Sequence, residues 1–294
     1  MGVPVDKPYK AAVAVVMITL NEGHNMRAVL ENVVHWAQQI FVVDSYSQDR
    51  TVDIALQYGA HVVQRRFRGF GDQWNFALNQ LPIKTPWTMK LDPDERLTNE
   101  LKSSIEAAIK SGSHTGYSFD RRLWFMGNPL PVKQEILRVW KTGACSFKDV
   151  LVNEHPLLAG PTLKLPGFLE HHDSPDLDHW LAKQNLYSTA EAVMLFRKSE
   201  LAERPTLFGS SLQRRMWLKK YFRHFPGRYW ALFFYHWIFQ GAWRAGATGF
   251  IWARLRVVVM RLIEYKHLEM ELTGRLPIKR VYGAGKPDPR VRQY

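Results

Sequence analysis

The sequence of 294 residues contains only one cysteine, Cys145. A single cysteine cannot form a disulfide within the chain, which excludes a small disulfide-stabilised scaffold and fits a reducing compartment. We expect Cys145 to be a small buried hydrophobic residue. The first ten residues, MGVPVDKPYK, lack an apolar signal core, and Asp6 stands where a myristoylation site needs Ser or Thr. We therefore expect a cytoplasmic protein.

The chain also lacks a long hydrophobic run. Its longest stretch without a charged residue, 229–243, has 15 residues, whereas a membrane-spanning helix needs about 20 apolar residues. No transmembrane segment is therefore predicted. Repeats and low-complexity segments are absent as well. The hydrophobic content of 46% and aromatic content of 13% are enough for a packed core, which excludes a disordered chain.

Acidic residues are missing from one long region. The net charge is +13, and residues 204–261 contain eleven Lys or Arg with no Asp or Glu, while the rest of the chain is nearly balanced. A local positive field implies an anionic partner, such as a membrane surface, a nucleic acid or an acidic acceptor. Residues 208–252 also hold fifteen aromatic residues. A pair of interfacial helices fits this pattern, with aromatic rings at headgroup depth and basic residues towards anionic lipid.

Two other interpretations of this region stay open. One is a packed helical appendage with a basic outer face. The other is a platform for single-stranded nucleic acid, but so many consecutive aromatic residues exceed what base stacking needs, and no nucleic-acid partner is expected. The predicted organisation is a first domain over residues 1–200, a basic aromatic helical region for membrane association over 201–273, and a basic tail over 274–294.

Strand and helix patterns alternate in the first 110 residues. Strands are predicted over 11–20, 40–43, 60–63 and 85–91, and helices over 26–38, 51–58, 73–80 and 97–110. This alternation is typical of βαβ units and a parallel sheet. Further strands are predicted over 117–119 and 136–140, with Gly127-Asn128-Pro129 as a turn between them. Another strand is predicted over 168–172, and a helix over 178–196.

Polar side chains follow the predicted strands where ligands bind in open α/β sheets. Asn21 and Glu22 follow the first strand, Asp44 the second, and the turn Asp92-Pro93-Asp94 the fourth. Hard cations are held by one or two carboxylates together with substrate phosphates. We hypothesise that this acidic turn binds Mg²⁺ or Mn²⁺, which in turn grips a nucleotide diphosphate. A solvated acidic turn is the simpler alternative.

Further chemistry-bearing residues lie in the second half of the chain. Glu154 ends one apolar run, and His171 and His172 end another. With Asp92 and Asp94, Glu154 and His171 have the side chains for metal-assisted transfer from a nucleotide donor, in which the glutamate deprotonates the acceptor. Adjacent residues of a strand face opposite sides, so at most one of the two histidines belongs to such a site.

Four motifs in order resemble a known family, the family-two glycosyltransferases. They are VVMITLNE (15–22), IFVVDSYSQDRT (40–51), GFGDQWNFAL (69–78) and LDPDE (91–95), and the likeness continues through 153–155, 169–172 and 241–266. The closest branch is that of bacterial lipopolysaccharide core enzymes, which add a sugar to a lipid-linked acceptor. The resemblance implies a Rossmann-like GT-A fold, an α/β architecture with a mostly parallel sheet flanked by helices, here followed by an amphipathic helical appendage. Two departures are Tyr46, where glycine is usual, and Trp74, where arginine is common.

The resemblance also implies a role for each matching residue. The implied donor-binding residues are Thr19, Asn21, Glu22, Asp44, Gln73, Asn75 and Asp92, with Asp44 on the base or ribose. Asp92 and Asp94 form the metal and diphosphate motif, and His171 or His172 is a further ligand for the metal or the diphosphate. Glu154 is the implied catalytic base, and the reaction inverts the anomeric centre by direct displacement.

Together these inferences predict a metal-dependent, inverting glycosyltransferase. It would use a nucleotide-sugar donor and a lipid-linked saccharide acceptor, and it would lie on the cytoplasmic face of the inner membrane as a peripheral, monotopic protein. A nucleotidyltransferase is an alternative, although the glycine-rich loop of that chemistry is missing, because residues 19–25 hold one glycine. A non-enzymatic protein that binds the membrane surface is the second alternative.

Overall fold

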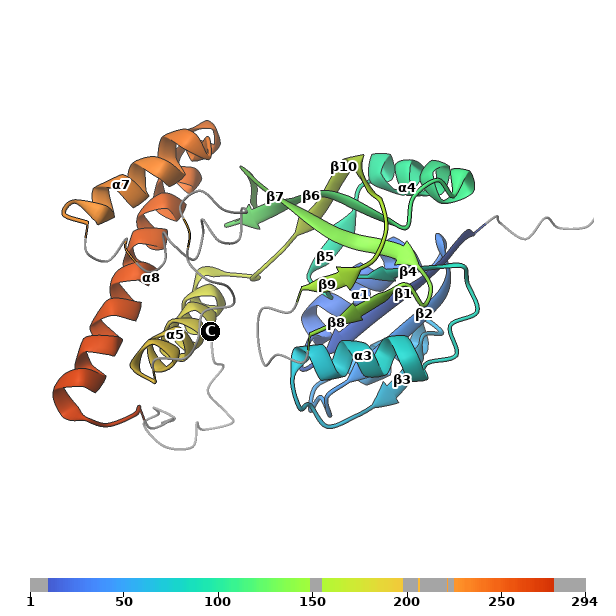
Figure 1. Ribbon diagram of the computed structural model, residues 1–294, viewed down its shortest axis with the longest axis horizontal. Helices are drawn as coiled ribbons and strands as arrows, with labels where there is room; N and C mark the ends of the chain where they lie inside the picture. The colour runs from blue at the N-terminus through green and yellow to red at the C-terminus, as the bar shows by residue number, and fades with distance from the viewer. Residues whose placement is uncertain (1–9, 149–154, 198–205, 207–220, 222–224, 278–294) are drawn as a thin grey trace, which may run out of the picture. The chain divides into compact units, whose positions relative to one another are not determined.

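The computed structural model describes residues 10–148, 155–197, 206, 221 and 225–277. The chain divides into two compact units (Figure 1). The first comprises Met1–Leu177 and Trp237–Phe250, and the second comprises Asp178–His236 and Ile251–Tyr294. The two units are described one after the other.

An eight-stranded sheet organises the first unit, in the order β3-β2-β1-β4-β7-β6-β10-β5. The strands are β1 (Ala11–Thr19), β2 (Ala37–Asp44), β3 (His61–Gln64), β4 (Trp87–Lys90), β5 (Glu95–Leu97), β6 (Gly116–Phe125), β7 (Asn128–Lys141) and β10 (Thr162–His171). Four of the seven pairings in this sheet of the described chain are parallel, namely β1–β2, β1–β4, β2–β3 and β6–β10. The predicted mostly parallel α/β architecture is confirmed. Two short strands, β8 (Cys145–Phe147) and β9 (Pro156–Leu158), pair with each other.

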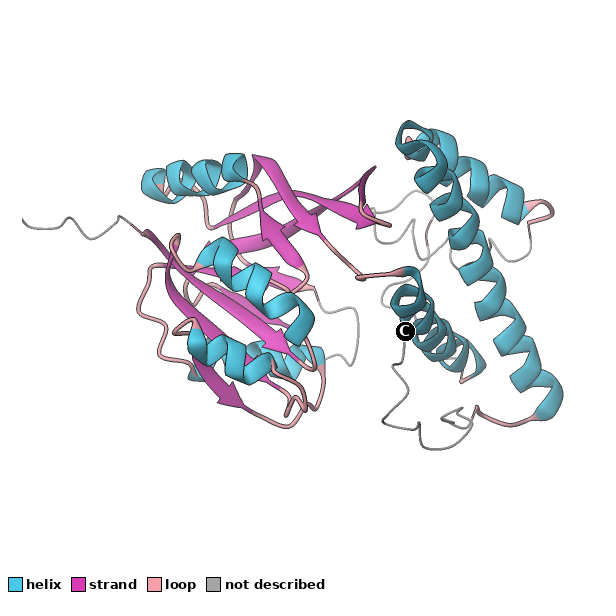
Figure 2. Ribbon diagram, turned by 180° about the vertical axis from the view of Figure 1, so that it is seen from behind, coloured by secondary structure: helices cyan, strands magenta, loops and turns pink. Residues whose placement is uncertain are grey.

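Helices cover both faces of this sheet because β1 is apolar on both sides (Figure 2). Successive side chains of a strand point to opposite faces. Val13, Val15 and Met17 pack with α1 (Gly23–Val33), α2 (Thr51–Gln57) and α4 (Asn99–Ser111) in one core. Ala14 and Val16 pack with α3 (Phe70–Gln80) and β8 in the other. A strand that is buried on both faces has a continuous apolar sequence, and this is why β1 could be predicted from the sequence.

The first helix is shorter at its C-terminus than its periodicity predicts. The prediction extended it to residue 38, but α1 ends at Val33, and Ala37 already belongs to β2. The backbone N–H of Ala11 donates to the carbonyl of Trp36 at 2.8 Å, and Ala11 pairs with Ala37 across the sheet. Pairing with β1 therefore overrides the local helical preference.

The second unit is built from three described helices, α5 (Leu177–Phe196), α7 (Arg228–Phe234) and most of α8 (Gly246–Thr273). Lys266 on α8 reaches α5, where its Nζ lies 2.8 Å from both Ser188 Oγ and Thr189 Oγ1. Arg228 on α7 pairs with Glu264 on α8 at 2.7 Å. Within the described residues, no helix has the length and apolarity that crossing a membrane requires.

Candidate functional site

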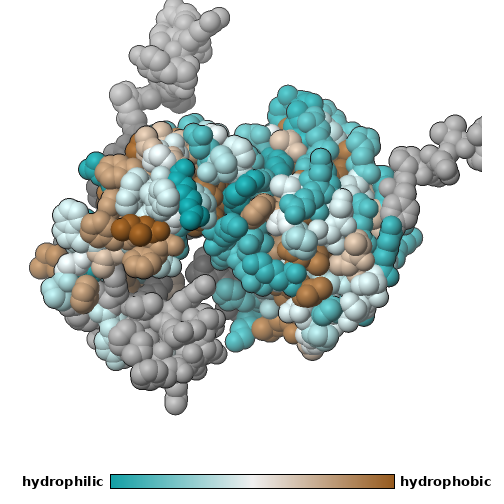
Figure 3. All heavy atoms as spheres, turned by 90° about the horizontal axis from the view of Figure 1, so that it is seen from above, coloured by the Kyte–Doolittle hydropathy of each residue, from teal (hydrophilic) through white to brown (hydrophobic). Residues whose placement is uncertain are grey.

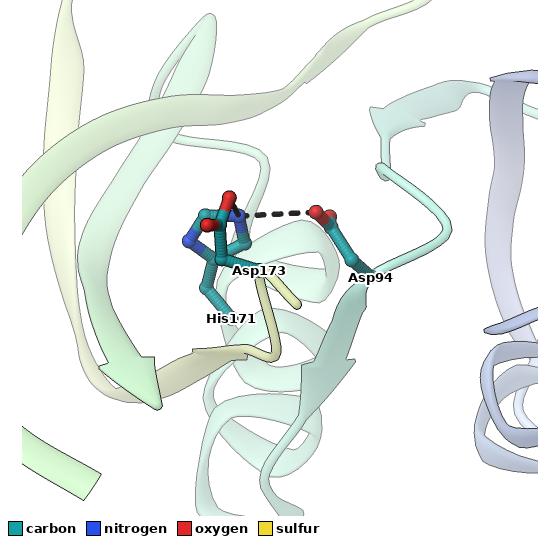
Figure 4. Close-up of side chains that lie close together, drawn as sticks. All are labelled: Asp94, His171 and Asp173. Carbon is teal, nitrogen blue, oxygen red and sulfur yellow. Dashed lines mark hydrogen bonds and ion pairs between the residues drawn. The ribbon is translucent and has the colours of Figure 1, made fainter. Parts of the chain in front are cut away.

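Three side chains meet beside the acidic turn that follows β4 (Figure 4). Asp94 Oδ2 lies 3.2 Å from His171 Nε2, and Asp173 Oδ1 lies 3.8 Å from the same nitrogen. One ligand atom from each residue lies within 4.8 Å of the other two, and all three residues are partly buried. Carboxylate oxygens and an imidazole nitrogen are common ligands of divalent metals. This group, which we call the acidic cluster, therefore has the donor atoms for a metal ion.

Strand pairing brings the acidic cluster together. β5 runs antiparallel to β10, so that Glu95 lies opposite His171. The backbone N–H of His172 also donates to the carbonyl of Asp94 at 2.8 Å. Asp173 was not among the predicted site residues, although one signal was present. It stands two residues after His171, on the same face if the strand direction continues.

The two adjacent histidines have different surroundings. His171 belongs to the acidic cluster, whereas the ring of His172 stacks on Trp124, with 4.8 Å between the ring centroids. Burial lowers the pKa of His172 below its usual value. The preceding residue, Glu170, is held by Arg122, whose Nε donates at 3.1 Å, and by the indole N–H of Trp124. The end of β10 is thus fixed on both sides of His171.

Asp92, the first carboxylate of the Asp-Pro-Asp turn, lies outside the acidic cluster. Its Oδ2 accepts a hydrogen bond from Arg138 Nη2 at 2.6 Å, and the same nitrogen lies 2.6 Å from Glu95 Oε1. Burial opposes ionisation of Asp92, but the positive charges of Arg138 and Lys90 outweigh it and lower the pKa of this carboxyl. Burial raises the pKa of Glu95, which has no exposed surface. Asp92 is therefore an ionised partner of an arginine in this structure.

Asp44 ties three strand ends together at the predicted donor edge. Its carboxylate accepts hydrogen bonds from Thr19 Oγ1 at the end of β1 (2.9 Å), from the backbone N–H of Ser47 (2.9 Å) and from Gln64 Nε2 at the end of β3 (3.0 Å). Burial raises the pKa of Asp44, but these hydrogen bonds outweigh burial, and the net pKa lies below the usual 3.8. The role of Asp44 on the base or ribose stays a prediction.

Replacing Asp44 by asparagine is expected to lower the free energy of unfolding at pH 7 by about 1 to 2 kcal/mol, because charge-assisted hydrogen bonds become neutral ones. The folded pKa is depressed, so the wild-type carboxylate stabilises the fold above its unfolded pKa, and this stabilisation is lost as the pH falls through the folded value. Urea unfolding at pH 7 and below about pH 3 measures both limits. The difference in free energy of unfolding between the wild type and Asp44→Asn should be smaller in acid than at pH 7. An equal difference at both pH values would contradict this account.

The remaining donor-side residues also make internal contacts. Asn21 Oδ1 accepts from the backbone N–H of Gln48 at 2.8 Å, and Glu22 Oε2 accepts from Asn25 at 2.9 Å. Gln73 Oε1 accepts from Arg65 at 2.7 Å. Asn75 uses both ends of its amide on the backbone of Phe147, at 2.8 and 2.9 Å, and so anchors β8 to α3. Contacts of these residues with a donor stay predictions. Glu154, the predicted base, lies outside the described residues.

Tyr46 shows how the chain accommodates its departure from the family pattern. Its φ of +64° lies in the left-handed region, which favours the glycine usual at this position. The side chain is about half exposed. A non-glycine residue held in this conformation stores strain of order 1 kcal/mol, and such strain clusters at functional sites.

The sheet order and the acidic turn at the end of β4 define a GT-A fold. A solved mannosyltransferase from Pyrobaculum calidifontis, in complex with GDP-Man and Mn²⁺, shares it with a TM-score of 0.50 over 90% of this chain and 88% of that one. Sequence identity is 14%, so this likeness shows the fold alone.

Residues 14–155 match the family described as glycosyl transferase family 2, and this segment is a glycosyltransferase domain of that family. A glycosyltransferase of Rickettsia bellii is 26% identical over 200 residues, which cover 63% of this chain and 67% of that protein. The lipopolysaccharide core biosynthesis glycosyltransferase LpsC of Rhizobium meliloti is 27% identical over 255 residues, which cover 82% of this chain and 86% of LpsC.

Proposed function

We propose that this protein transfers a sugar, with inversion, from a nucleotide-sugar donor to a lipid-linked saccharide at the cytoplasmic face of the inner membrane. The observation that carries the proposal is the acidic cluster of Asp94, His171 and Asp173 beside the carboxyl end of β4, within a GT-A fold. Ligands of open α/β sheets bind at this edge. The family match favours glycosyl transfer over nucleotidyl transfer and over a purely membrane-binding protein.

The residues of the acidic cluster fit a divalent cation. Two carboxylates suit Mg²⁺ or Mn²⁺, and the imidazole nitrogen of His171 favours Mn²⁺ over Mg²⁺. Asp94, His171 and Asp173 would hold the ion, and the bound ion would neutralise negative charge on the departing nucleotide diphosphate. The solved mannosyltransferase, which has the same fold and is in complex with GDP-Man and Mn²⁺, supports the proposal that a cation and a nucleotide sugar bind together here.

Other residues of the chain would bind and activate the two substrates. Thr19, Asn21, Glu22, Asp44, Gln73, Asn75 and Asp92 are proposed for the donor side. Glu154 is proposed to take the proton from the acceptor hydroxyl as that oxygen attacks the anomeric carbon, while the bond from this carbon to the diphosphate oxygen breaks. A direct displacement of this kind inverts the anomeric centre.

Nucleoside diphosphates in a thermal melt, each with and without Mn²⁺, test the donor site. We expect one base to raise the melting temperature only when Mn²⁺ is present, because Asp94, His171 and Asp173 would hold the cation and its charge would favour binding of the diphosphate. The Asp94→Asn variant, melted in parallel, should lose the metal-dependent part of the shift. Equal stabilisation with and without Mn²⁺ would contradict a metal-held diphosphate, and stabilisation by no nucleotide would contradict the donor site.

The lipid-linked acceptor is proposed from two observations. LpsC, the relative from Rhizobium meliloti, carries lipopolysaccharide core biosynthesis in its name. The helical segment of the chain also exposes large aromatic side chains, with Trp230 on α7 at 70% exposure and Phe239 in the helical turn Tyr235–Phe239 at 81%. Figure 3 shows hydrophobic side chains at the surface of the second unit, to which α7 belongs. Exposed aromatic residues in a region rich in Lys and Arg suit the interface of an anionic bilayer.

Liposome sedimentation tests this membrane association. We expect the protein to pellet with vesicles containing anionic lipid, and less so when NaCl rises from about 0.1 M to about 0.5 M, because salt screens the basic region. Changing Trp230 and Phe239 together to serine should weaken partitioning about tenfold, since each ring buries apolar area in the interface. Leu56→Ser is the matched control, because Leu56 is an exposed hydrophobic residue of α2. Equal partitioning of all three proteins would contradict the proposal.

A further inference from the structure

Arg138 holds two carboxylates of the acidic turn at once. Its side chain, on β7, is 7% exposed. A single terminal nitrogen, Nη2, lies 2.6 Å from Asp92 Oδ2 and 2.6 Å from Glu95 Oε1. These two acids stand at the first and last positions of the four-residue turn from Asp92 to Glu95, which contains Asp94. One guanidinium group therefore clamps both ends of the segment that carries a member of the acidic cluster.

Further contacts close the turn and hold its opposite side. Glu95 Oε2 accepts from the backbone N–H of Asp92 at 3.0 Å, which joins the two ends directly. Arg96 Nη1 donates to the carbonyl of Pro93 at 2.6 Å, and its Nη2 donates to the carbonyl of Asn25 at 3.1 Å. The turn is thus fixed from two directions by Arg138 and Arg96. Arg121 adds a looser ion pair, with its Nη1 3.5 Å from Glu95 Oε1, whereas Arg138 contacts both carboxylates at 2.6 Å.

Fold stability is a weak reason for an arginine at this position. Removing a guanidinium group and two carboxylates from water is costly, and well-packed apolar residues often replace such groups without loss of stability. Within the described part of the chain, Arg138 Nε is also buried without a hydrogen-bond partner, which adds to that cost. A costly arrangement at the edge of the acidic cluster points to a role in the cluster.

We propose that Arg138 is a positioning residue that sets the acidic turn so that Asp94 meets His171 and Asp173 in the geometry that binds a divalent cation. This inference rests on the metal site proposed above. Arg138 does not touch the cation. It acts by holding Asp92 and Glu95, so that the backbone between them keeps Asp94 in place.

The direction in which cation affinity changes when Arg138 is removed distinguishes a positioning role from a purely electrostatic one. Arg138 is a positive group near the cation site, so Coulomb repulsion alone predicts that removing it tightens cation binding. Removing it also releases Asp92, which becomes available as an additional ligand. A positioning role predicts weaker cation binding, because a ligand that loses its supporting contacts binds the metal less well. In typical metal sites this loss of affinity is roughly 10- to 100-fold.

Mn²⁺ binding to the full chain tests the proposal, with the electron paramagnetic resonance signal of free Mn²⁺ as the readout. We expect Arg138→Met to weaken Mn²⁺ binding about tenfold or more. Arg138→Lys keeps the charge and loses the planar fork, and should bind between the wild type and Arg138→Met. Arg228→Met is the matched control, because it removes an Arg–Glu pair in the other unit and should leave Mn²⁺ binding unchanged.

Several outcomes would overturn the proposal. Thermal melts identify the variants that fold, and if Arg138→Met does not fold, the charge-conserving Arg138→Lys decides. Wild-type or tighter Mn²⁺ affinity in a folded Arg138 variant would overturn the positioning role while leaving the metal site standing. A wild-type chain that binds no Mn²⁺ would overturn the metal site itself, and the role of Arg138 with it.

Discussion

Replacing Asp94 by asparagine is expected to lower sugar transfer by about 1000-fold or more while leaving the fold intact. The substitution keeps the shape of the side chain and removes one of two negative charges from the acidic cluster, so a bound cation would lose one of its two anionic ligands. Asp94 is partly exposed, and the exchange leaves no cavity. Initial rates of product formation, with the donor that the thermal melts identify, measure the loss, and the melting temperature reports the fold.

Two further variants define what the loss means. Asp173→Asn should reduce transfer by a similar factor, because Asp173 offers the second carboxylate of the cluster. Asp53→Asn is the matched control, since Asp53 is an exposed aspartate on α2 and should leave the rate unchanged. Near-normal transfer by folded Asp94→Asn would contradict the proposed metal site.

Replacing Gly167 by alanine is expected to lower the free energy of unfolding by about 3 kcal/mol or more. Gly167 lies in β10 with φ at +96°, a conformation that side chains rarely adopt. A Cβ at this position would lie 2.6 Å from the backbone nitrogen of Leu101 and 2.7 Å from its Cα, at the start of α4. Backbone atoms cannot move aside as a side chain can, so β10 and α4 must separate. Urea unfolding measures the change.

Gly59→Ala provides the matched control for this clash. Gly59 also has a positive φ, +73°, but a Cβ there meets nothing within 4 Å. Its substitution should cost only the conformational strain, about 1 kcal/mol. The difference between the two variants therefore isolates the contact with Leu101. Equal destabilisation by both substitutions would show that α4 accommodates the extra methyl group.

The strands and helices of the first hundred residues were largely predictable because their signals are local. β1 is a continuous apolar run, and the polar residues after β1, β2 and β4 mark the carboxyl ends of three neighbouring parallel strands. α1 was predicted too long because the backbone pairing of Ala37 with β1 depends on a partner about 25 residues away and not on local periodicity.

The candidate site was only partly predictable because several of its contacts span long distances in the sequence. Asp94 and His171 were both named from sequence patterns, whereas Asp173 was missed, because its spacing of two residues from His171 was the one signal that pointed to it. The ion pair of Asp92 with Arg138 joins residues 46 positions apart. No motif marks that arginine, since it stands within an ordinary strand pattern, and only the antiparallel placement of β7 beside β4 brings it to the acidic turn.

The antiparallel pairing of β5 with β10 makes the acidic cluster a product of nearly the whole first unit. Asp94 and His171 are 77 residues apart, and the segment that matches the family ends at residue 155. A truncated chain that stops there would retain the recognisable family sequence and yet hold one of the three cluster residues. During synthesis, the cluster can assemble only after β10 has left the ribosome and added to the sheet beside β6. The metal site proposed for this cluster can therefore form only late in the synthesis of each molecule, after most of the parallel sheet is able to form.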